Sequence, residues 1–272
     1  MIYHEQHPPA GPLAPFIQTY WYWEGEDPGH AKDAIVASSR MGLLINLRRD
    51  DLSWYSGDGF AAHSKLKGMA LRGTHAQAFA IDARQPHMMG VQFWPGGAFP
   101  FFRPPASELS NRFLSLEDLW GADAERLYQR LVQAPTPQDK FAILERALLA
   151  AAPRDLGHHP AVATALARLR RCRDASVASL AKEAEVSHKR FIRLFTEEMG
   201  VAPKLFLRMR RFRRLLDAVW RRPSVDWAEE AFVHGYYDQP HLIREFHEFS
   251  GFTPTDYMRR RGPYSQHIPL SA

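Results

Sequence analysis

The sequence has a single cysteine, Cys172, among its 272 residues. One cysteine excludes an intramolecular disulfide and any zinc site built from several cysteines. No segment approaches the roughly 18 consecutive apolar residues of a transmembrane helix, so we expect no membrane partner. The first residues, MIYHEQHPPAGP, lack the basic and then apolar pattern of a signal peptide. We therefore expect a cytoplasmic protein.

Motifs of catalysis and cofactor binding are also missing. None of the histidines in residues 1–152 has the His-x-His spacing that, with a carboxylate, holds a metal in a barrel enzyme. There is no Gly-rich phosphate loop and no Gly-x-Ser-x-Gly nucleophile motif. We therefore expect no catalytic residues, no metal and no cofactor. An enzyme or metal-binding barrel with a DNA-targeting module remains the alternative hypothesis.

The charge of the chain is unevenly distributed. Residues 1–154 hold 15 Lys+Arg and 16 Asp+Glu, a balance of −1, whereas residues 155–272 hold 20 and 14, a balance of +6. A basic excess confined to one part is typical of a domain that binds a polyanion. An ordinary domain with a solvated basic surface would have the same balance.

Residues 1–105 alternate short apolar segments with Gly and Pro. Residues 16–23, 42–47, 77–82 and 89–94 are rich in β-favouring side chains, which predicts a small antiparallel β barrel or sandwich. Several aromatic residues and one cation in these segments could line a ligand pocket, although barrel core is the simpler interpretation. These candidate ligand-binding residues are Trp21, Trp23, Arg40, Phe93 and Trp94.

The rest of the chain has helical periodicity. Thr136 and Pro137 predict a capped helix start, and Leu127, Leu131 and Val132 are expected on one buried helix face. The sequence thus predicts an α+β fold in which accessory helices follow the β domain and an all-α part follows a linker. The expected domains are 1–152, a linker at 153–160 with His158 and His159 as polar spacers, a helical domain at 161–262, and a flexible tail at 263–272.

Two segments of the helical part, residues 176–200 and 224–251, follow the same plan. Each has a short helix, a tight turn and a second helix with a capping residue, Ser187 in the first and Asp238 in the second. Gly200 is placed to end its helix in the left-handed conformation, and Gly235 lies in the second turn. This pattern predicts a duplicated helix-turn-helix, whose second helices can enter a major groove.

A single helix is predicted between the two units, bounded by Pro203 and Pro223. About 18 residues at 1.5 Å per residue give about 27 Å. This length is near the roughly 34 Å repeat of the major groove. One rigid helix could therefore hold both reading helices over successive grooves of one DNA face.

Residues 161–261 resemble the DNA-binding domain of AraC-type (AraC/XylS) transcriptional regulators. The motifs that carry the resemblance are Leu180-Ala181, Val186-Ser187, Phe191–Phe195, Gly200, the block GYYDQPHLIREF at 235–246, Gly251–Pro254 and Tyr257. The N-terminal part is similar to an uncharacterised β-rich domain often fused ahead of this module, in Tyr20–Trp23, Gly90–Ala98 and Leu116–Gly121. The resemblance implies a sequence-specific DNA-binding regulator whose N-terminal domain senses a small molecule, dimerises, or both.

Helical phase gives the candidate DNA-binding residues of each reading helix. Arg193 suits guanine, Gln239 suits adenine, and Arg244 suits guanine or a phosphate. The full set is His188, Lys189, Ile192, Arg193 and Thr196 in the first helix, and Gln239, Pro240, Ile243, Arg244 and His247 in the second. The expected partners are double-stranded DNA and a second copy of the chain, with RNA polymerase and a small-molecule effector as further candidates.

Three positions depart from the family pattern. Glu185 stands at a turn position where the family often has Gly. Glu230 stands at a usually apolar position and His234 follows on the same helix, which predicts looser packing of the second unit. The arginines of the connecting helix are expected to form mostly a solvated face, with one or two contacting phosphate. They are Arg208, Arg210, Arg211, Arg213 and Arg214.

Overall fold

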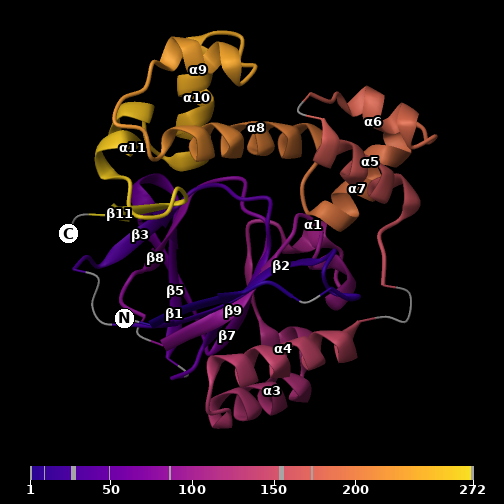
Figure 1. Cartoon of the computed structure of the whole chain (residues 1–272), viewed down its shortest axis with the longest axis vertical. Coiled ribbons are helices and arrows are strands. Elements are labelled where there is room, and N and C mark those ends of the chain that lie inside the picture. The colour runs from indigo at the N-terminus through magenta and orange to yellow at the C-terminus, as the bar shows by residue number, and fades with distance from the viewer. Residues whose placement is uncertain are drawn as a thin grey trace.

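The computed structural model describes residues 2–8, 10–25, 29–48, 50–85, 87–152, 156–172 and 174–270. Two antiparallel sheets form the N-terminal part, and helices flank them on two sides (Figure 1). The C-terminal helices lie along one side of the sheets, and α3 and α4 lie on the opposite side (Figure 1). The predicted α+β class is confirmed, and the two sheets do not close into a barrel.

Each sheet is fully antiparallel. The first has the order β1 (Ile2–Gln6), β2 (Ile17–Glu24), β9 (His87–Phe93), β4 (Gly42–Asn46), β7 (Met69–Arg72) and β10 (Phe113–Ser115). The second has the order β11 (His267–Leu270), β3 (Lys32–Ile35), β8 (Phe79–Asp82), β5 (Asp51–Ser56) and β6 (Ala62–Lys67). Short 3-10 turns, η1 (Asp58–Phe60) and η2 (Phe99–Phe101), follow β5 and β9.

The first sheet buries its two faces differently. Because side chains alternate along a strand, Tyr20, Leu43 and Val91 point to one face, where each has no exposed surface. Trp21 and Leu44 point to the other face, toward the second sheet, and are only half-buried. The first face is therefore a closed core, whereas the second, the inner face, is incompletely covered.

Among the described residues, four helices that come after β9 complete that closed core: α1 (Ala106–Leu109), α2 (Leu116–Trp120), α3 (Ala122–Gln133) and α4 (Pro137–Ala151). The predicted cap is confirmed, because the Thr136 side chain accepts a hydrogen bond from the Asp139 amide and Pro137 opens α4. Phe141 of α4 stacks on Tyr20 with ring centroids 5.9 Å apart. The prediction for Val132 was wrong: the residue is 47% exposed, because Ala124, Leu127 and Leu131 already form the buried stripe.

In the C-terminal part, the described residues form seven helices. They are α5 (Pro160–Arg171), α6 (Val177–Glu183), α7 (His188–Met199), α8 (Pro203–Val219), α9 (Trp227–Val233), α10 (Gln239–Ser250) and α11 (Pro254–Arg260). Phe206 of α8 meets Phe195 of α7, and Phe212 of α8 meets Phe246 of α10, with centroids 5.4 Å and 5.2 Å apart. The apolar side of α8 is therefore shared by both helix-turn-helix units.

The segment that follows α11 differs from the expected flexible tail. Residues 267–270 form β11, which pairs with β3 of the N-terminal part. Ile268 has no exposed surface, and the Tyr257 hydroxyl donates a hydrogen bond to the Ser265 carbonyl at 3.0 Å. Strand pairing with residues more than 200 positions away leaves no local signal in the sequence, so the tail was mistaken for a loose end.

The expected polar spacers also have defined contacts. His158 Nδ1 lies 2.6 Å from Glu198 Oε2 of α7, and the Ala161 amide donates to His159 Nδ1, which caps α5. The spacer interpretation was therefore wrong for both histidines, because their partners lie on helices and not in solvent. Residues 153–155, in the expected linker, lie outside the described part of the chain.

Replacing Ile268 with Ala tests whether the last strand is structural. We expect Ile268→Ala to lower the free energy of unfolding of the full chain by about 2–4 kcal/mol, since a fully buried aliphatic side chain is truncated. Urea denaturation followed by circular dichroism measures the change. The control is Val132→Ala, which removes exposed apolar surface and should change stability by about 0.5 kcal/mol at most. Equal, small effects of the two substitutions would show that the tail is loose after all.

Candidate nucleic-acid interface

The first helix-turn-helix unit consists of α6 and α7. Its turn is closed by a hydrogen bond from the Val186 amide to the Ala181 carbonyl at 3.2 Å. Glu185 adopts a left-handed φ of 54°, which costs a non-Gly residue about 1 kcal/mol. Ser187 caps α7 by accepting from the Arg190 amide, and Gly200 ends it with a φ of 81°. The predicted cap and helix end are confirmed, and Glu185 stands where glycine would be unstrained.

The second unit, α9 and α10, repeats this geometry. The Tyr236 amide donates to the Ala231 carbonyl at 2.9 Å, and Gly235 has a φ of 72° at the position equivalent to Glu185. Asp238 caps α10 by accepting from the His241 amide at 2.7 Å. Pro240 lies in the first turn, where its missing N–H costs nothing. The two units thus fix α7 and α10 by the same set of local hydrogen bonds.

The outer side of α7 carries a group of basic residues. His188, Lys189 and Arg193 are exposed, whereas Ile192 and Thr196 are half-buried. The Thr196 hydroxyl donates to the Ile192 carbonyl at 2.7 Å, so this side chain lies back on its own helix. Arg190 is also exposed and was not among the expected DNA-binding residues, although the basic run His188–Arg190 was a signal in the sequence.

Arg190 belongs to the same surface as the expected readers. Ser187, Lys189, Arg190 and Arg193 surround a shallow hollow of about 270 Å³ at the start of α7. Arg193 Nη1 lies 3.0 Å from Glu197 Oε1, and both side chains are exposed, at 62% and 40%. An exposed pair of this kind contributes little stability, so Arg193 can leave Glu197 for a stronger acceptor.

The outer side of α10 is more open. All five expected residues are exposed: Gln239, Pro240, Ile243, Arg244 and His247. Arg244 forms no ion pair with any residue that the structure describes, so its guanidinium can accept a new partner. Two aromatic residues beside α10 were missed, Phe232 at 87% and Tyr237 at 92% exposed. The sequence could have predicted this exposure, because both residues lie outside the apolar stripe of the second unit.

The arginines of α8 do not form the solvated face that was expected. All five are half-buried, and most have partners far away in the sequence. Arg210 donates to the carbonyls of Leu169 and Cys172, and Arg213 donates to Asp217, Ser265 and Gln266. The expectation failed because helical phase shows which way a side chain points but not which segment covers it.

Glu245 of α10 is the partner of two of these arginines. It is 1% exposed and accepts from Arg208 Nε at 2.9 Å and Arg211 Nη2 at 2.7 Å. His241 Nε2 lies 3.7 Å from the same carboxylate, and Arg211 also donates to the Gly235 carbonyl at 3.0 Å. A buried carboxylate held from two sides fixes α10 and its turn to α8.

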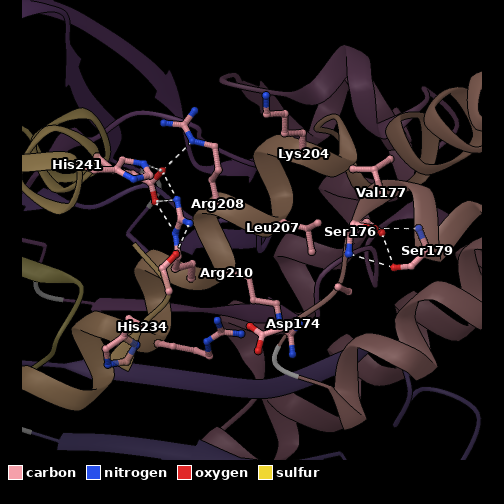
Figure 2. A pocket seen from close by; sticks show the side chains of 15 residues that line it. Asp174, Ser176, Val177, Ser179, Lys204, Leu207, Arg208, Arg210, His234 and His241 are labelled. Carbon is pink, nitrogen blue, oxygen red and sulfur yellow. Dashed lines mark hydrogen bonds and ion pairs between the residues drawn. The ribbon is translucent and has the colours of Figure 1, made fainter. Parts of the chain in front are cut away.

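A groove of about 1070 Å³ separates the two units. Figure 2 shows side chains of α8 between the start of α6, with Ser176 and Ser179, and the second unit, with His234 and His241. Its basic residues are Lys204, Arg208, Arg210, Arg211 and Arg214. Lys204 is exposed here and has no hydrogen bond or ion pair with a described residue, whereas Arg208 and Arg211 are held by Glu245.

The second departure from the family pattern, Glu230, is buried at 4% exposure but is not alone. Its carboxylate pairs with Arg222, and its Oε2 lies 3.2 Å from His234 Nε2. The looser packing expected of the second unit stays a prediction, because these contacts show how Glu230 is paired and not how tightly its neighbours pack. A buried acid between two basic side chains replaces an apolar contact.

Both units also contact the N-terminal part. The end of α7 packs on α1, and a Cβ added at Gly200 would lie 2.5 Å from Thr74 Oγ1. At the end of α10, the Phe249 carbonyl accepts from the Ala37 amide at 2.8 Å. The reading helices are thus held at their C-terminal ends, while their N-terminal halves stay exposed.

The candidate ligand-binding residues fall into two groups. Trp21 and Trp23 lie half-buried on the inner face of the first sheet, and Arg40 lies 5.8 Å from the ring of Trp94. Phe93 lies on the opposite face with no exposed surface, 5.8 Å from the ring of Phe101. The structure therefore places Phe93 on the other face from Trp21 and Trp23, and Arg40 and Trp94 form a contact of their own.

The described residues contain no group of three or more His, Cys, Asp or Glu arranged to hold a metal ion. Within the same part of the chain, every helix is too short or too polar to cross a membrane.

A pair of matched substitutions tests the role of Glu245. We expect Glu245→Gln to lower the free energy of unfolding by about 2–3 kcal/mol, because two half-buried arginines lose their counter-charge. Glu248→Gln should cost less than about 1 kcal/mol, since this exposed carboxylate forms an ion pair, among the described residues, with Arg208 alone. Chemical denaturation measures both, and equal losses would mean that Glu245 does not fix α10.

Comparison with protein-family models gives two matches. Residues 5–115 match a domain of unknown function (DUF6597), and residues 180–260 match a helix-turn-helix domain. The second match covers α7 to α11 and the end of α6. No curated protein matches the chain.

Comparison with solved structures gives matches at low sequence identity. The C-terminal domain of AraT, a response regulator from Geobacillus stearothermophilus, is 22% identical, with 39% of this chain and 91% of that chain covered and a TM-score of 0.35. ToxT from Vibrio cholerae is 9% identical, with 94% and 98% covered and a TM-score of 0.44. ToxT bound to (E)-4-(8-methylnaphthalen-1-yl)but-3-enoic acid is 10% identical, with the same coverage and a TM-score of 0.45.

The helix-turn-helix match at residues 180–260 and the motif residues within it identify the family of the C-terminal domain. Both turns, both caps and the GYYDQPHLIREF block lie within residues 180–260. The chain therefore carries, behind a domain of the DUF6597 family, an AraC-type helix-turn-helix domain, which is the domain arrangement of a DNA-binding transcription regulator.

Proposed function

We propose that this protein is a sequence-specific transcription regulator that inserts α7 and α10 into successive major grooves of double-stranded DNA. The observation that carries the proposal is the pair of capped helices with exposed basic residues, joined by one rigid helix. The 17 residues of α8 span about 26 Å at 1.5 Å per residue. This length suits two neighbouring grooves of one DNA face, which are about 34 Å apart.

The first reading helix supplies most of the positive charge. Arg193 and Lys189 contact base edges or phosphates, and Arg190 contacts a phosphate at the entrance of the groove. Ile192 offers its apolar edge to a thymine methyl group, and His188 and Thr196 border the contact. The exposed hollow around Lys189, Arg190 and Arg193 supports this assignment.

The second reading helix has fewer charges and more hydrogen-bonding groups. Gln239 hydrogen-bonds adenine, and Arg244 hydrogen-bonds guanine or a phosphate. Ile243, Pro240 and His247 lie beside them on the surface that faces the DNA. The open surface of all five residues supports this role. Because Arg244 has no counter-charge among the described residues, it can bind DNA without first breaking an ion pair.

The N-terminal domain, proposed as residues 1–152, serves as the sensing or dimerising part of this cytoplasmic regulator. The DNA-binding domain is proposed as residues 161–262. Two linked DNA-binding modules in a homodimer would gain affinity on a two-site operator. Contact with RNA polymerase is the route by which such a protein would activate transcription.

Replacing the two reader arginines separately tests the proposal. On a DNA site selected by the wild-type protein from random duplexes, Arg193→Ala and Arg244→Ala should each weaken binding by about 1–3 kcal/mol. Each should also relax preference at its own one or two base pairs, in positions about one helical turn apart. Fluorescence anisotropy and a repeated selection with each variant measure both effects.

Arg130→Ala is the matched control, because Arg130 is an exposed arginine of α3 in the N-terminal part. It should leave affinity and preference as in the wild type. If Arg193→Ala and Arg244→Ala select the same sequences as the wild type, neither residue reads a base and the proposed docking is wrong.

A further inference from the structure

One row of side chains crosses the inner face of the first sheet. In the strand register, Gly42 of β4 stands opposite Gln92 of β9 and opposite Arg72 of β7. An added Cβ at Gly42 would lie 3.4 Å from Arg72 Nη2, so glycine leaves space beside the guanidinium. Phe113 of β10 is the next residue in the row. Arg72 therefore places a cation on the inner face, and the neighbouring strands β4 and β10 contain no acidic residue.

The guanidinium of Arg72 is poorly satisfied. Nη2 lies 3.4 Å from Gln92 Oε1 and 3.5 Å from the Arg40 carbonyl, both at the outer limit for a hydrogen bond. Its Nε is buried without any partner. Within the described part of the chain, no carboxylate pairs with Arg72. An arginine in such surroundings ordinarily has a carboxylate beside it.

Gln92 is held so that its oxygen faces Arg72. Its Nε2 donates to the Met41 carbonyl at 2.7 Å, which fixes the orientation of the amide. The amide oxygen accepts from Arg72 but carries no formal charge, so it does not neutralise the guanidinium. Arg72 therefore keeps its full positive charge and most of its donors.

A second arginine, Arg40, adds its positive charge to the surroundings of Arg72. Arg40 lies 5.8 Å from the Trp94 ring, and its side chain has no ion pair with a described residue. Burial lowers the pKa of Arg72 to about 10, and the positive charge of Arg40 adds to the effect. Burial likewise lowers the pKa of Arg40 to about 10, with Arg213 of α8 adding to the effect and Asp217 opposing it. Two neighbouring cations in a poorly solvated place destabilise the protein unless an anion joins them.

The surface that continues from this pair is aromatic and incompletely covered. Trp21, Trp23 and Leu44 on the inner face are half-buried, whereas residues on the opposite face of the same strands are fully buried. Across from them, Trp54 of β5 stacks on Phe113 with centroids 4.5 Å apart, and both are half-buried. Apolar surface next to an unpaired cation fits a ligand with an apolar body and an anionic end.

We propose that Arg72, Arg40 and Gln92 bind the carboxylate of a small organic anion whose apolar or aromatic body lies on the inner face beside Trp21. A planar guanidinium can donate two parallel hydrogen bonds to a carboxylate. The Met41 carbonyl fixes the Gln92 amide, and the Gln92 oxygen in turn orients the Arg72 guanidinium. The inference rests on the proposed sensing role of the N-terminal domain and names the class of its ligand. Because Arg40 also interacts with Arg213 and Asp217, a bound anion changes the field at α8, which joins the two reading helices.

Thermal unfolding of the full chain with matched charged and neutral probes tests the proposal. The probes are benzoate, naphthalene-2-carboxylate and octanoate at about 5 mM, each compared with its own primary amide. At least one carboxylate should raise the Tm of the wild type by about 2 °C or more, and its amide should not. Arg72→Met and Arg40→Met should lose this rise, whereas the control Arg130→Met should keep it.

The ligand-free variants give a second measurement. Because Arg72 is a cation without a counter-charge, ligand-free Arg72→Met should melt at or above the wild-type temperature. A fall of several degrees would mean that Arg72 is an ordinary structural contact and would overturn the proposal. If Arg72→Met does not fold, Arg40→Met carries the ligand test.

Three results with the probes would overturn the proposal. They are no carboxylate-specific rise, an equal rise with the amides, or a rise that both arginine variants retain. DNA binding of the same samples is measured in parallel. Intact DNA binding without a carboxylate effect removes only the ligand inference, whereas a carboxylate effect without DNA binding removes only the proposed function.

Discussion

The packing of both helix-turn-helix units on the single helix α8 is the constraint on which the DNA-binding part depends. One side of α8 places Phe206 against α7 and Phe212 against α10, so the two units share a core. Another side holds the Glu245 carboxylate between Arg208 and Arg211. The relative position of the reading helices is therefore set by contacts that neither unit makes alone.

Local signals in the sequence were sufficient for the helix-turn-helix geometry. A cap such as Ser187 or Asp238 acts on an amide three residues away, and Gly200 needs only its own left-handed conformation. Such features depend on few neighbouring residues, so a sequence reading can identify them. The strain at Glu185 follows in the same way, because the turn requires a positive φ whatever residue stands there.

The features that the sequence did not reveal are those whose partners lie far along the chain. Glu245 reads as one more polar helix residue until α8 is placed beside it, and Ile268 reads as part of a tail until β3 pairs with it. The same holds in the N-terminal part. Arg40 was a ligand candidate from its sequence context, but only the strand register places Arg72 and Gln92 on either side of Gly42, on one face of the sheet. Trp21 and Trp23 lie on the same face as Gln92, whereas Phe93 belongs to the opposite face because strand residues alternate.

The most direct test of the account is a methylation-protection and hydroxyl-radical footprint of the full-length protein on a selected DNA site. Because α8 holds α7 and α10 in a fixed relation, the account predicts two groups of protected major-groove guanines about 10 base pairs apart. Both groups should lie on one face of the duplex, with protected backbone between them. A single protected groove, or two groups on opposite faces, would contradict a rigid pair of reading helices.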